Sequence, residues 1–489
     1  MVSNKRVAIH WIRSMSKSLK AIIFTIGALI GLLVLAAIAL FLFLDANAYK
    51  PRLEAAVSGM MGMEFRVGGH LGIGFFPNLL VTLKDVHIRN RGTEVVTARE
   101  ARIGIDFLTL LHKGVRIEKI VLEHPTISIE KARDGTFNFE KSEEARGPLP
   151  NLNLAKVSFS DGTLRYVDKQ TGWGVEAGDC SLDASRLQLS GRERPGIMNQ
   201  LSLAADVVCG KVRTQDHTAS DVKFSVVGQR GGFELKPLTM RVFSGQGSGS
   251  IRGDFTGAVP HYRVRYSLSQ FHIDEFLKPL SPQNVAEGSM DFSANLSMQG
   301  KNMNELRQTA AGQISLRGKN LILNGRDLDR EFARFESSQT FNLVDVGAFF
   351  FAGPVGLAVT KGYNFASIFQ GSEGRSEIRT VVSDWKVERG VAQAQDVAMA
   401  TNENRVALQG GLDFVNKRFN DVTVALIDAK GCAKVRQKIR GTFQKPLVEK
   451  PSVLKSLTGP VLKLLKQVGS LFSSGACEVF YAGSVAAPK

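Results

Sequence analysis

The sequence has few of the residues from which catalytic and metal sites are built. Its 489 residues include four cysteines and eight histidines. The histidines are scattered singly and no C-x-x-C is present, so the spacing of a zinc site is missing. G-x-S-x-G, H-E-x-x-H, P-loop and EF-hand motifs are also absent from the sequence. We therefore expect no catalytic residue, no metal site and no cofactor, and we expect that the protein is not an enzyme.

The body of the chain also lacks an excess of either charge. The formal net charge is +16, but residues 1–20 supply five Lys or Arg without an acid, and residues 430–466 supply ten against one acid. Residues 21–429 are left at only +2. A nucleic-acid-binding domain would spread basic residues over its folded body. Nucleic acid is therefore not expected as a partner.

One long apolar run lies near the N-terminus. Residues 21–44 contain no charge, and as a helix at about 1.5 Å per residue they are long enough to cross a bilayer. The alternative is a signal peptide cleaved at Ala46-Asn47-Ala48, but its apolar region would be shorter. Because basic residues precede the run, we predict a single transmembrane helix with a cytoplasmic N-terminus. A second run, Val346–Val359, is shorter and predicts a buried hairpin of helices or an interfacial segment.

Most of the remaining sequence has the period of a β-strand. Residues 289–299, SMDFSANLSMQ, alternate apolar and polar at every position. Asp134-Gly135, Asp161-Gly162 and Asn324-Gly325 supply turn chemistry, and the first two predict tight hairpins. The glycines of 245–249 open no helix, and we interpret them as turn glycines rather than a phosphate cradle. Short helices are expected at Tyr49–Met60, Ile273–Leu280, parts of 326–371, and 452–472.

These patterns predict a mainly β fold, with a long curled antiparallel sheet that has one apolar face. The apolar face must be covered by a second sheet or by something that is not protein, and acyl chains suit a position beside a membrane anchor. Since a register slip of one residue exchanges the two faces of a strand, the inward residues are a hypothesis. The candidates for the groove lining are Ile103, Ile105, Phe107, Met290, Phe292 and Leu296.

The cysteines and the basic C-terminal region belong to the translocated part. Sequence order favours Cys180–Cys209 and Cys432–Cys477, although four cysteines allow three pairings. The leucine and valine spacing of 454–471 predicts an amphipathic helix that packs on the end of the sheet. A functional alternative is that this helix caps the groove while basic residues meet anionic headgroups or an acidic partner. The basic residues are Lys434, Arg436, Lys438, Arg440, Lys463 and Lys466.

The predicted organisation has five parts. They are a basic cytoplasmic N-terminus (1–20), a transmembrane helix (21–44), an N-terminal β region (45–145), an extended β-groove region (146–430), and a basic disulfide-tied tail with the amphipathic helix (431–489).

The chain resembles the AsmA family of bacterial envelope proteins along its whole length. The resemblance is carried by the anchor followed by residues 48–73 and 75–88, by IEKIVLEHPTISIEKARDGTFNFEK (117–141), and by VSFSDGTLRYVDKQTG (157–172). In the C-terminal half it is carried by 245–255, 311–325, 352–359 and the cysteine-paired tail from Gly431. The resemblance implies a single-pass inner-membrane protein with its bulk in the periplasm. It also implies a repeating β-groove like that of the chorein-type lipid-transfer proteins.

The function expected from the residues and the resemblance together is phospholipid binding and transfer along the groove, in support of outer-membrane lipid homeostasis and biogenesis. The expected partners are phospholipid acyl chains, the inner membrane, and outer-membrane or periplasmic assembly proteins. The alternative is a non-enzymatic scaffold whose sheet edges recruit outer-membrane proteins for insertion by strand pairing.

Overall fold

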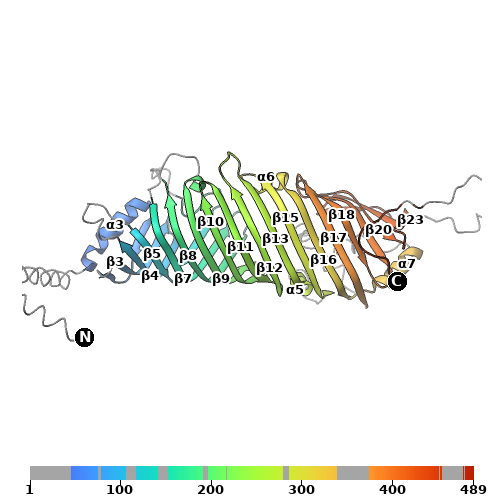
Figure 1. Ribbon diagram of the computed structural model, residues 1–489, viewed down its shortest axis with the longest axis horizontal. Helices are drawn as coiled ribbons and strands as arrows, with labels where there is room; N and C mark the ends of the chain where they lie inside the picture. The colour runs from blue at the N-terminus through green and yellow to red at the C-terminus, as the bar shows by residue number, and fades with distance from the viewer. Residues whose placement is uncertain are drawn as a thin grey trace, which may run out of the picture.

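One sheet of 23 strands forms nearly all of the described structure, and the strands lie side by side from α3 at one end to α7 at the other (Figure 1). The computed structural model describes residues 46–74, 79–105, 117–140, 152–190, 197–215, 217–278, 286–338, 374–450, 452–453, 477 and 479–488. At about 4.8 Å between neighbouring strands, the sheet is on the order of 90 Å long. The prediction of a mainly β fold with a curled sheet and a few short helices is confirmed.

The first half of the sheet follows a short N-terminal helical segment. Its elements are η1 (Ala46–Tyr49), α3 (Lys50–Met61), β1 (Glu64–Val67), β2 (Leu71–Gly74), β3 (Leu79–Asn90), β4 (Thr93–Ile105), β5 (Ile117–Glu123), β6 (Thr126–Lys131), β7 (Leu152–Asp168), β8 (Gly174–Leu189), η3 (Ile197–Asn199), β9 (Leu201–Thr214), β10 (Thr218–Gln229) and β11 (Gly232–Val242).

The second half contains three short helices between strands. Its elements are β12 (Gly245–Asp254), β13 (His261–His272), α5 (Ile273–Leu277), β14 (Ala286–Glu287), β15 (Ser289–Gln299), α6 (Met303–Thr309), β16 (Ala311–Asn324), α7 (Leu328–Ser338), β17 (Arg375–Glu388), β18 (Val391–Ala400), β19 (Arg405–Asp413), β20 (Arg418–Ile427), β21 (Ala433–Thr442), β22 (Lys445–Val448) and β23 (Ser452–Val453).

The sheet is mixed, so the expectation of an antiparallel sheet was wrong at one place. Strands β5 and β6 both pair parallel with β7, β5 with its first half and β6 with its second half. On their other side both pair antiparallel with β4. The chain therefore crosses between β6 and β7 instead of turning back in a hairpin, and a crossover of this kind leaves no local turn signal in the strands themselves.

The predicted hairpin at Asp161-Gly162 was also wrong, because β7 continues through it. Asp161 has φ 54°, which a tight turn and a β-bulge can both use. On one side of β7, strand β5 ends and strand β6 begins at the same level. Between them His124 has φ 50°, and its amide donates to the Ser160 carbonyl at 3.1 Å. With β8 paired along the other side, both neighbours hold β7 in one line.

The other two predicted turns occur without a hairpin of strands. Asp134-Gly135 forms a turn in which Gly135 has φ 90°, but the chain beyond it makes only an isolated bridge from Phe137 to Lys131. Asn324-Gly325 ends β16 and is followed by α7.

A row of bends crosses the sheet from strand to strand. The bends lie at residues with φ between 48° and 58°: Asp85, His124, Asp161, Asp179, Asp221, Gln270, Asn320 and Asp421. All of these are exposed, and the residue that follows each one is buried. The bends at Asp161, Asp179 and Asp221 lie at one level of the sheet, since Gly162 pairs with Cys180, Cys180 with Cys209 of β9, and Cys209 with Val222.

These bends explain why the sheet curls. The strand pairs slip by one residue of register at Asp161, Asp221, Gln270 and Asp421, which is the signature of a β-bulge. A bulge bends its strand and increases the local twist, so a row of bulges folds the sheet along one line. The side toward which the buried residues point is called the inner face below.

The helices agree with the sequence where the structure describes them. Helix α3 begins with Pro51 in its first turn and ends at Gly62 with φ 68°, as expected for helix ends. Helices α5 and α7 lie in the predicted stretches at Ile273–Leu280 and 326–371. Of the stretch 452–472, only Ser452–Val453 is described, and it forms β23.

Several expectations concern residues outside the described ranges. These are the transmembrane helix at 21–44, the Val346–Val359 segment, most of the amphipathic helix of the tail, Phe107, Lys463 and Lys466. Within the described residues, none of the helices combines the length and the apolar composition needed to cross a bilayer.

A substitution at a bulge tests the role of the bends. Asp221→Val should lower the free energy of unfolding by about 1–2 kcal/mol, because a β-branched residue is strained at positive φ. Asp221→Gly should leave stability unchanged or slightly higher, since glycine adopts this conformation freely. The control is Lys223→Val, an exposed position on the same strand. Denaturant unfolding of the three variants checks the order, and equal stability of Asp221→Val and Lys223→Val would contradict it.

Candidate functional site

The inner face is buried at both ends of the sheet and half-exposed between them. At the N-terminal end Leu53 and Val57 of α3 pack against a cluster around Phe65, Val67 and Leu83. At the other end a large cluster, from Leu268 to Phe443, forms a closed core. This C-terminal cluster is sealed by α7, whose Leu328 and Phe332 are fully buried.

Between these two ends lies the candidate site, which we call the trough. Its floor is a small buried cluster that includes Phe159, Cys180, Val207, Cys209 and Val222. Around that floor the inner face of β7–β13 carries apolar side chains that are neither buried nor fully exposed. They are Val157, Leu164, Tyr166, Leu182, Val212, Phe224, Val226, Leu235, Leu238, Met240, Ile251 and Val264. The trough is thus a continuous apolar surface that the described residues cover only in part.

Glycines on β12 make room for an aromatic ring on the inner face, and this was missed in the sequence. The predicted turn at 245–249 is instead strand β12, with Gly245, Gly247 and Gly249 on the inner face. A Cβ at Gly247 would lie 2.2 Å from the Tyr266 hydroxyl. The Tyr266 ring therefore occupies the space over the glycines, and burial raises the pKa of its hydroxyl. The alternate spacing of the glycines was the available signal.

The predicted groove residues that the structure describes lie on β4 and β15, outside the trough strands β7–β13. Ile103 and Ile105 are half-buried on β4, where Ile103 packs against the N-terminal cluster. Met290 is only 3% exposed and belongs to the C-terminal cluster, while Phe292 and Leu296 are half-buried against that cluster. The burial of β15 alternates as its sequence does. No contact in the structure tests whether any of them touches a ligand.

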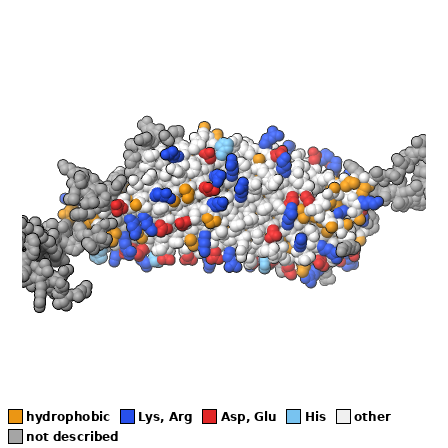
Figure 2. All heavy atoms as spheres, viewed as in Figure 1, with side chains coloured by type: hydrophobic (Ala, Val, Ile, Leu, Met, Phe, Trp, Pro, Cys, Tyr) orange, Lys and Arg blue, Asp and Glu red, His pale blue; other side chains and the backbone are white. Residues whose placement is uncertain are grey.

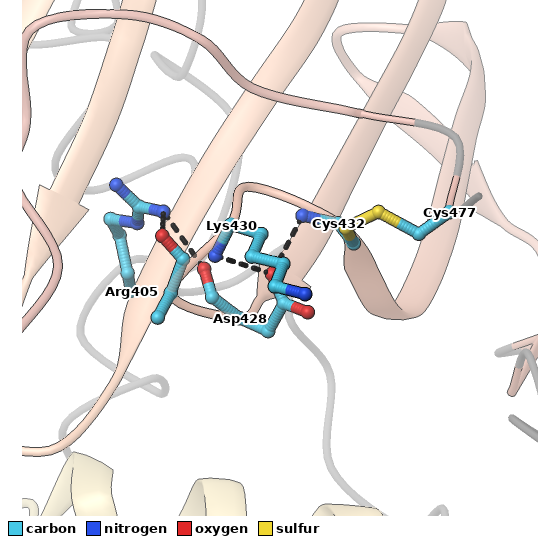
Figure 3. Close-up of a disulfide and its surroundings, with 6 residues drawn as sticks. Arg405, Asp428, Lys430, Cys432 and Cys477 are labelled. Atoms are coloured by element: carbon cyan, nitrogen blue, oxygen red, sulfur yellow. Dashed lines mark hydrogen bonds between the residues drawn. A yellow bond between two sulfur atoms is a disulfide. The ribbon is translucent and has the colours of Figure 1, made fainter. Parts of the chain in front are cut away.

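Both predicted cysteine pairs are present. Cys180 and Cys209 face each other across β8 and β9 on the floor of the trough, and Cys432 is bonded to Cys477 at the far end of the sheet (Figure 3). On the chain-entropy model, loops of 29 and 45 residues each stabilise by about 3–4 kcal/mol.

The second disulfide is anchored to a tight turn. The Asp428 carboxylate accepts hydrogen bonds from the amides of Lys430 (2.8 Å) and Cys432 (2.9 Å), and the Asp428 carbonyl accepts from the guanidinium of Arg405 at 2.8 Å (Figure 3). Arg405 is 7% exposed and also donates to the Val485 carbonyl at 2.8 Å. One guanidinium therefore joins the turn that carries Cys432 to the C-terminal segment.

That segment, residues 479–488, lies across the outer face as a strap. Phe480, Tyr481 and Val485 pack on small outward residues of β17–β20, which include Ala398, Ala400, Ala407 and Ala425. The Tyr481 hydroxyl donates to Asp396 at 2.5 Å, and the Ser484 amide donates to the same carboxylate at 3.0 Å.

These contacts shift the titration of both groups. Burial raises the pKa of the Tyr481 hydroxyl, and the neighbouring Asp396 carboxylate adds to the rise. Burial by itself would raise the pKa of Asp396, but the hydrogen bonds from Ser484 and Tyr481 outweigh it and lower the pKa overall.

Four of the predicted basic residues lie in the sheet itself and not on a separate tail. Lys434, Arg436, Lys438 and Arg440 alternate along β21 with the inward residues Val435, Gln437 and Ile439. The guanidinium of Arg436 lies 5.4 Å from the centre of the Phe480 ring, and Arg440 pairs with Glu449 at 3.0 Å. Two of these four basic residues therefore have structural contacts, Arg436 with the strap and Arg440 near the edge of the sheet.

Among the described residues no group of three or more His, Cys, Asp or Glu side chains is placed to hold a metal ion. The chemistry that the trough offers is burial of apolar surface, at roughly 25 cal/mol per Å².

Comparison with known proteins gives one result. The model of the AsmA family matches residues 15–207 and 150–340, two overlapping segments that together cover most of the chain. Neither the curated proteins nor the solved structures gave a significant match.

The strap contacts predict a defined pH dependence. Because the folded-state pKa of Asp396 lies below its unfolded value of about 3.9, the carboxylate stabilises the docked strap above that pH. The stabilisation is lost as the pH falls through the lower, folded-state pKa. Asp396→Asn should therefore speed hydrogen exchange of the Ser484 and Val485 amides at pH 7, and the difference from wild type should shrink in acid. Glu403→Gln, at an exposed position between β18 and β19, is the control, and an equal effect of both substitutions would contradict the assignment.

Proposed function

The chain belongs to the AsmA family, and from that premise we propose that it is a membrane-anchored periplasmic protein that binds phospholipid. In this proposal acyl chains lie on the trough and move along it, in support of outer-membrane lipid homeostasis and biogenesis. No covalent step is involved. Each methylene that leaves water contributes about 0.8 kcal/mol, so the hydrophobic effect alone supplies the binding free energy.

The observation that carries the proposal is the half-exposed inner face of β7–β13. Phe224 and Leu238 face each other across β10 and β11, and both remain partly exposed. An apolar surface of this kind favours an occupant, and acyl chains are an apolar occupant that suits a position beside a membrane anchor. The polar outer face in Figure 2, by contrast, carries scattered charged side chains and few hydrophobic ones.

The sheet edges give the scaffold hypothesis less support. At the N-terminal edge the outward amides of Phe65 and Val67 donate to Ser58 and Glu54 of α3, at 2.9 and 2.8 Å. At the far edge β22 is four residues long and contains Lys445 and Pro446. Short edges with lysine and proline resist strand addition.

Lipid loading is tested by mass spectrometry of lipid that co-purifies with the full chain. Phe224→Asp and Leu238→Asp should each abolish co-purifying phospholipid, because a carboxylate on the half-exposed surface of the trough would be desolvated by an acyl chain. Thr239→Asp is the matched control, since Thr239 is the next residue along β11 on the opposite face.

Two results would count against the lipid proposal. One is a wild-type protein without phospholipid, and the other is equal lipid loading in Leu238→Asp and Thr239→Asp. Unfolding midpoints of all variants separate loss of lipid from loss of fold, because a closed core would unfold when a carboxylate is introduced.

The topology belongs to the same proposal. We propose that residues 21–44 anchor the chain in the inner membrane, with residues 1–20 in the cytoplasm, as the basic residues before the run favour. An alkaline phosphatase domain fused after Lys489 should be active in bacteria, and green fluorescent protein at the same place should be dark. Reversal of the two signals would refute this orientation.

A further inference from the structure

The outer face is hollowed on the side opposite the C-terminal cluster. A depression of about 650 Å³, with nearly equal polar and apolar surface and with charged and hydroxyl side chains in its lining, crosses β13, β15, β16, β17 and β18. Its floor contains Ser267, Ser293 and Ser315, which are paired neighbours on three successive strands. On β12 the row continues with Ser248, whose hydroxyl lies 3.0 Å from that of Ser267. Short side chains in register therefore form a floor of hydroxyls, one per strand.

Longer polar side chains form the walls. Gln313 and Lys386 are paired neighbours on one side of the serine row, and Asp291 and Arg317 are paired neighbours on the other. One wall of the depression thus carries an amide and a positive charge, and the other wall carries a negative and a positive charge. The hydroxyl floor lies between them.

One end of the depression is fixed by a hydrogen-bonded carboxylate. Asp384 accepts from the Ser315 hydroxyl at 2.5 Å and from the Arg317 guanidinium at 2.6 Å. Asp396, its partner on β18, is held by the strap. Within the described part of the chain, the side chains of Ser269, Ser293 and Gln313 hydrogen-bond to no other residue. The end wall is therefore preorganised, while Ser293 on the floor and Gln313 on one wall keep polar groups available.

The chemistry of this surface selects one class of ligand. Carboxylates beside the basic groups disfavour a phosphate or another small anion, and the charged side chains on the walls disfavour an acyl chain. Sugar hydroxyls both donate and accept hydrogen bonds, as serine hydroxyls and amides do. The floor positions repeat at the strand spacing of about 4.8 Å, which is close to the length of one pyranose unit in an extended glycan.

We propose that this depression binds a linear, hydroxyl-rich glycan that lies across the strands along the long axis of the sheet. The site is on the opposite face from the trough, so the inference does not depend on lipid binding.

The test measures binding of N-acetylglucosamine oligomers to the full chain by calorimetry, in a detergent without a sugar headgroup. Affinity should rise at least about tenfold, or 1.4 kcal/mol, from the monomer to the tetramer, because the serine row has four positions, three in the depression and Ser248 beside it. It should rise little from tetramer to hexamer. A single sugar, such as the headgroup of a simple glycolipid, should bind weakly.

Two variants locate the site. Ser293→Lys places a long side chain on the floor and should weaken tetramer binding roughly tenfold. Gln313→Ala shortens a wall and should weaken binding without filling the site. Ser181→Lys, on the outer face of β8 away from the depression, is the matched control and should bind as wild type does.

Three results would overturn the inference. They are the absence of oligomer binding, a tetramer that binds no more tightly than the monomer, and equal affinity of Ser293→Lys and Ser181→Lys. Co-purifying phospholipid should be unchanged in all of these variants, so a failure here is distinct from a failure of the lipid proposal.

Discussion

Each bent strand contains one residue whose φ is positive, in the left-handed region. The rest of the structure depends on the bend that this residue makes. A long sheet with one apolar face would expose that face if it stayed flat, and the bulges at Asp161, Asp221 and Gln270 prevent this by bending the strands along one line. The residue after each bulge turns inward, so the bend places Val222 on the trough floor and Phe271 in the C-terminal cluster. Aspartate, asparagine and histidine suit these positions because they tolerate positive φ better than other side chains.

The two halves of the bent sheet differ in how completely the inner face is covered, and this difference determines the role of each half. From β13 onward the inner face packs on itself and on α7, and that part resembles an ordinary protein core, with Ile378, Val381 and Leu426 fully buried. Around β10 and β11, Phe224 and Leu238 have no such cover among the described residues. The same alternation of apolar residues thus stabilises the fold in the closed half. In the other half it leaves apolar surface exposed, and an occupant would gain free energy by burying that surface. The strap adds a second layer only over the closed half, where alanines allow it to lie flat.

The sequence predicted what is local and missed what depends on the neighbouring strand. The alternation of 289–299 could be taken directly from the residues, because side chains of a strand point to opposite faces whatever its partners are. Asp161-Gly162 was misassigned because positive φ permits a turn or a bulge, and only β6 and β8 on either side decide between them. A signal did exist: Lys84-Asp85-Val86, Ser220-Asp221-Val222 and Asn420-Asp421-Val422 share a polar left-handed residue before an inward valine. The strap left no such trace, since Tyr481 and Asp396 are 85 residues apart.

The closed half also limits where a ligand of the trough can exchange. An acyl chain that moved along the inner face toward β17 would meet Trp385, which is 3% exposed and donates its indole N–H to Ser383 at 2.7 Å. Passage would require the core around Ile378 and Val381 to open, at a cost comparable to creating cavities of side-chain size, several kcal/mol each. The disulfide at Cys432 and the buried Arg405 oppose such opening from the outer side. Under the proposed function, the described sheet therefore works as a trough whose exchange sites lie between β7 and β13, with the closed half as its rigid support.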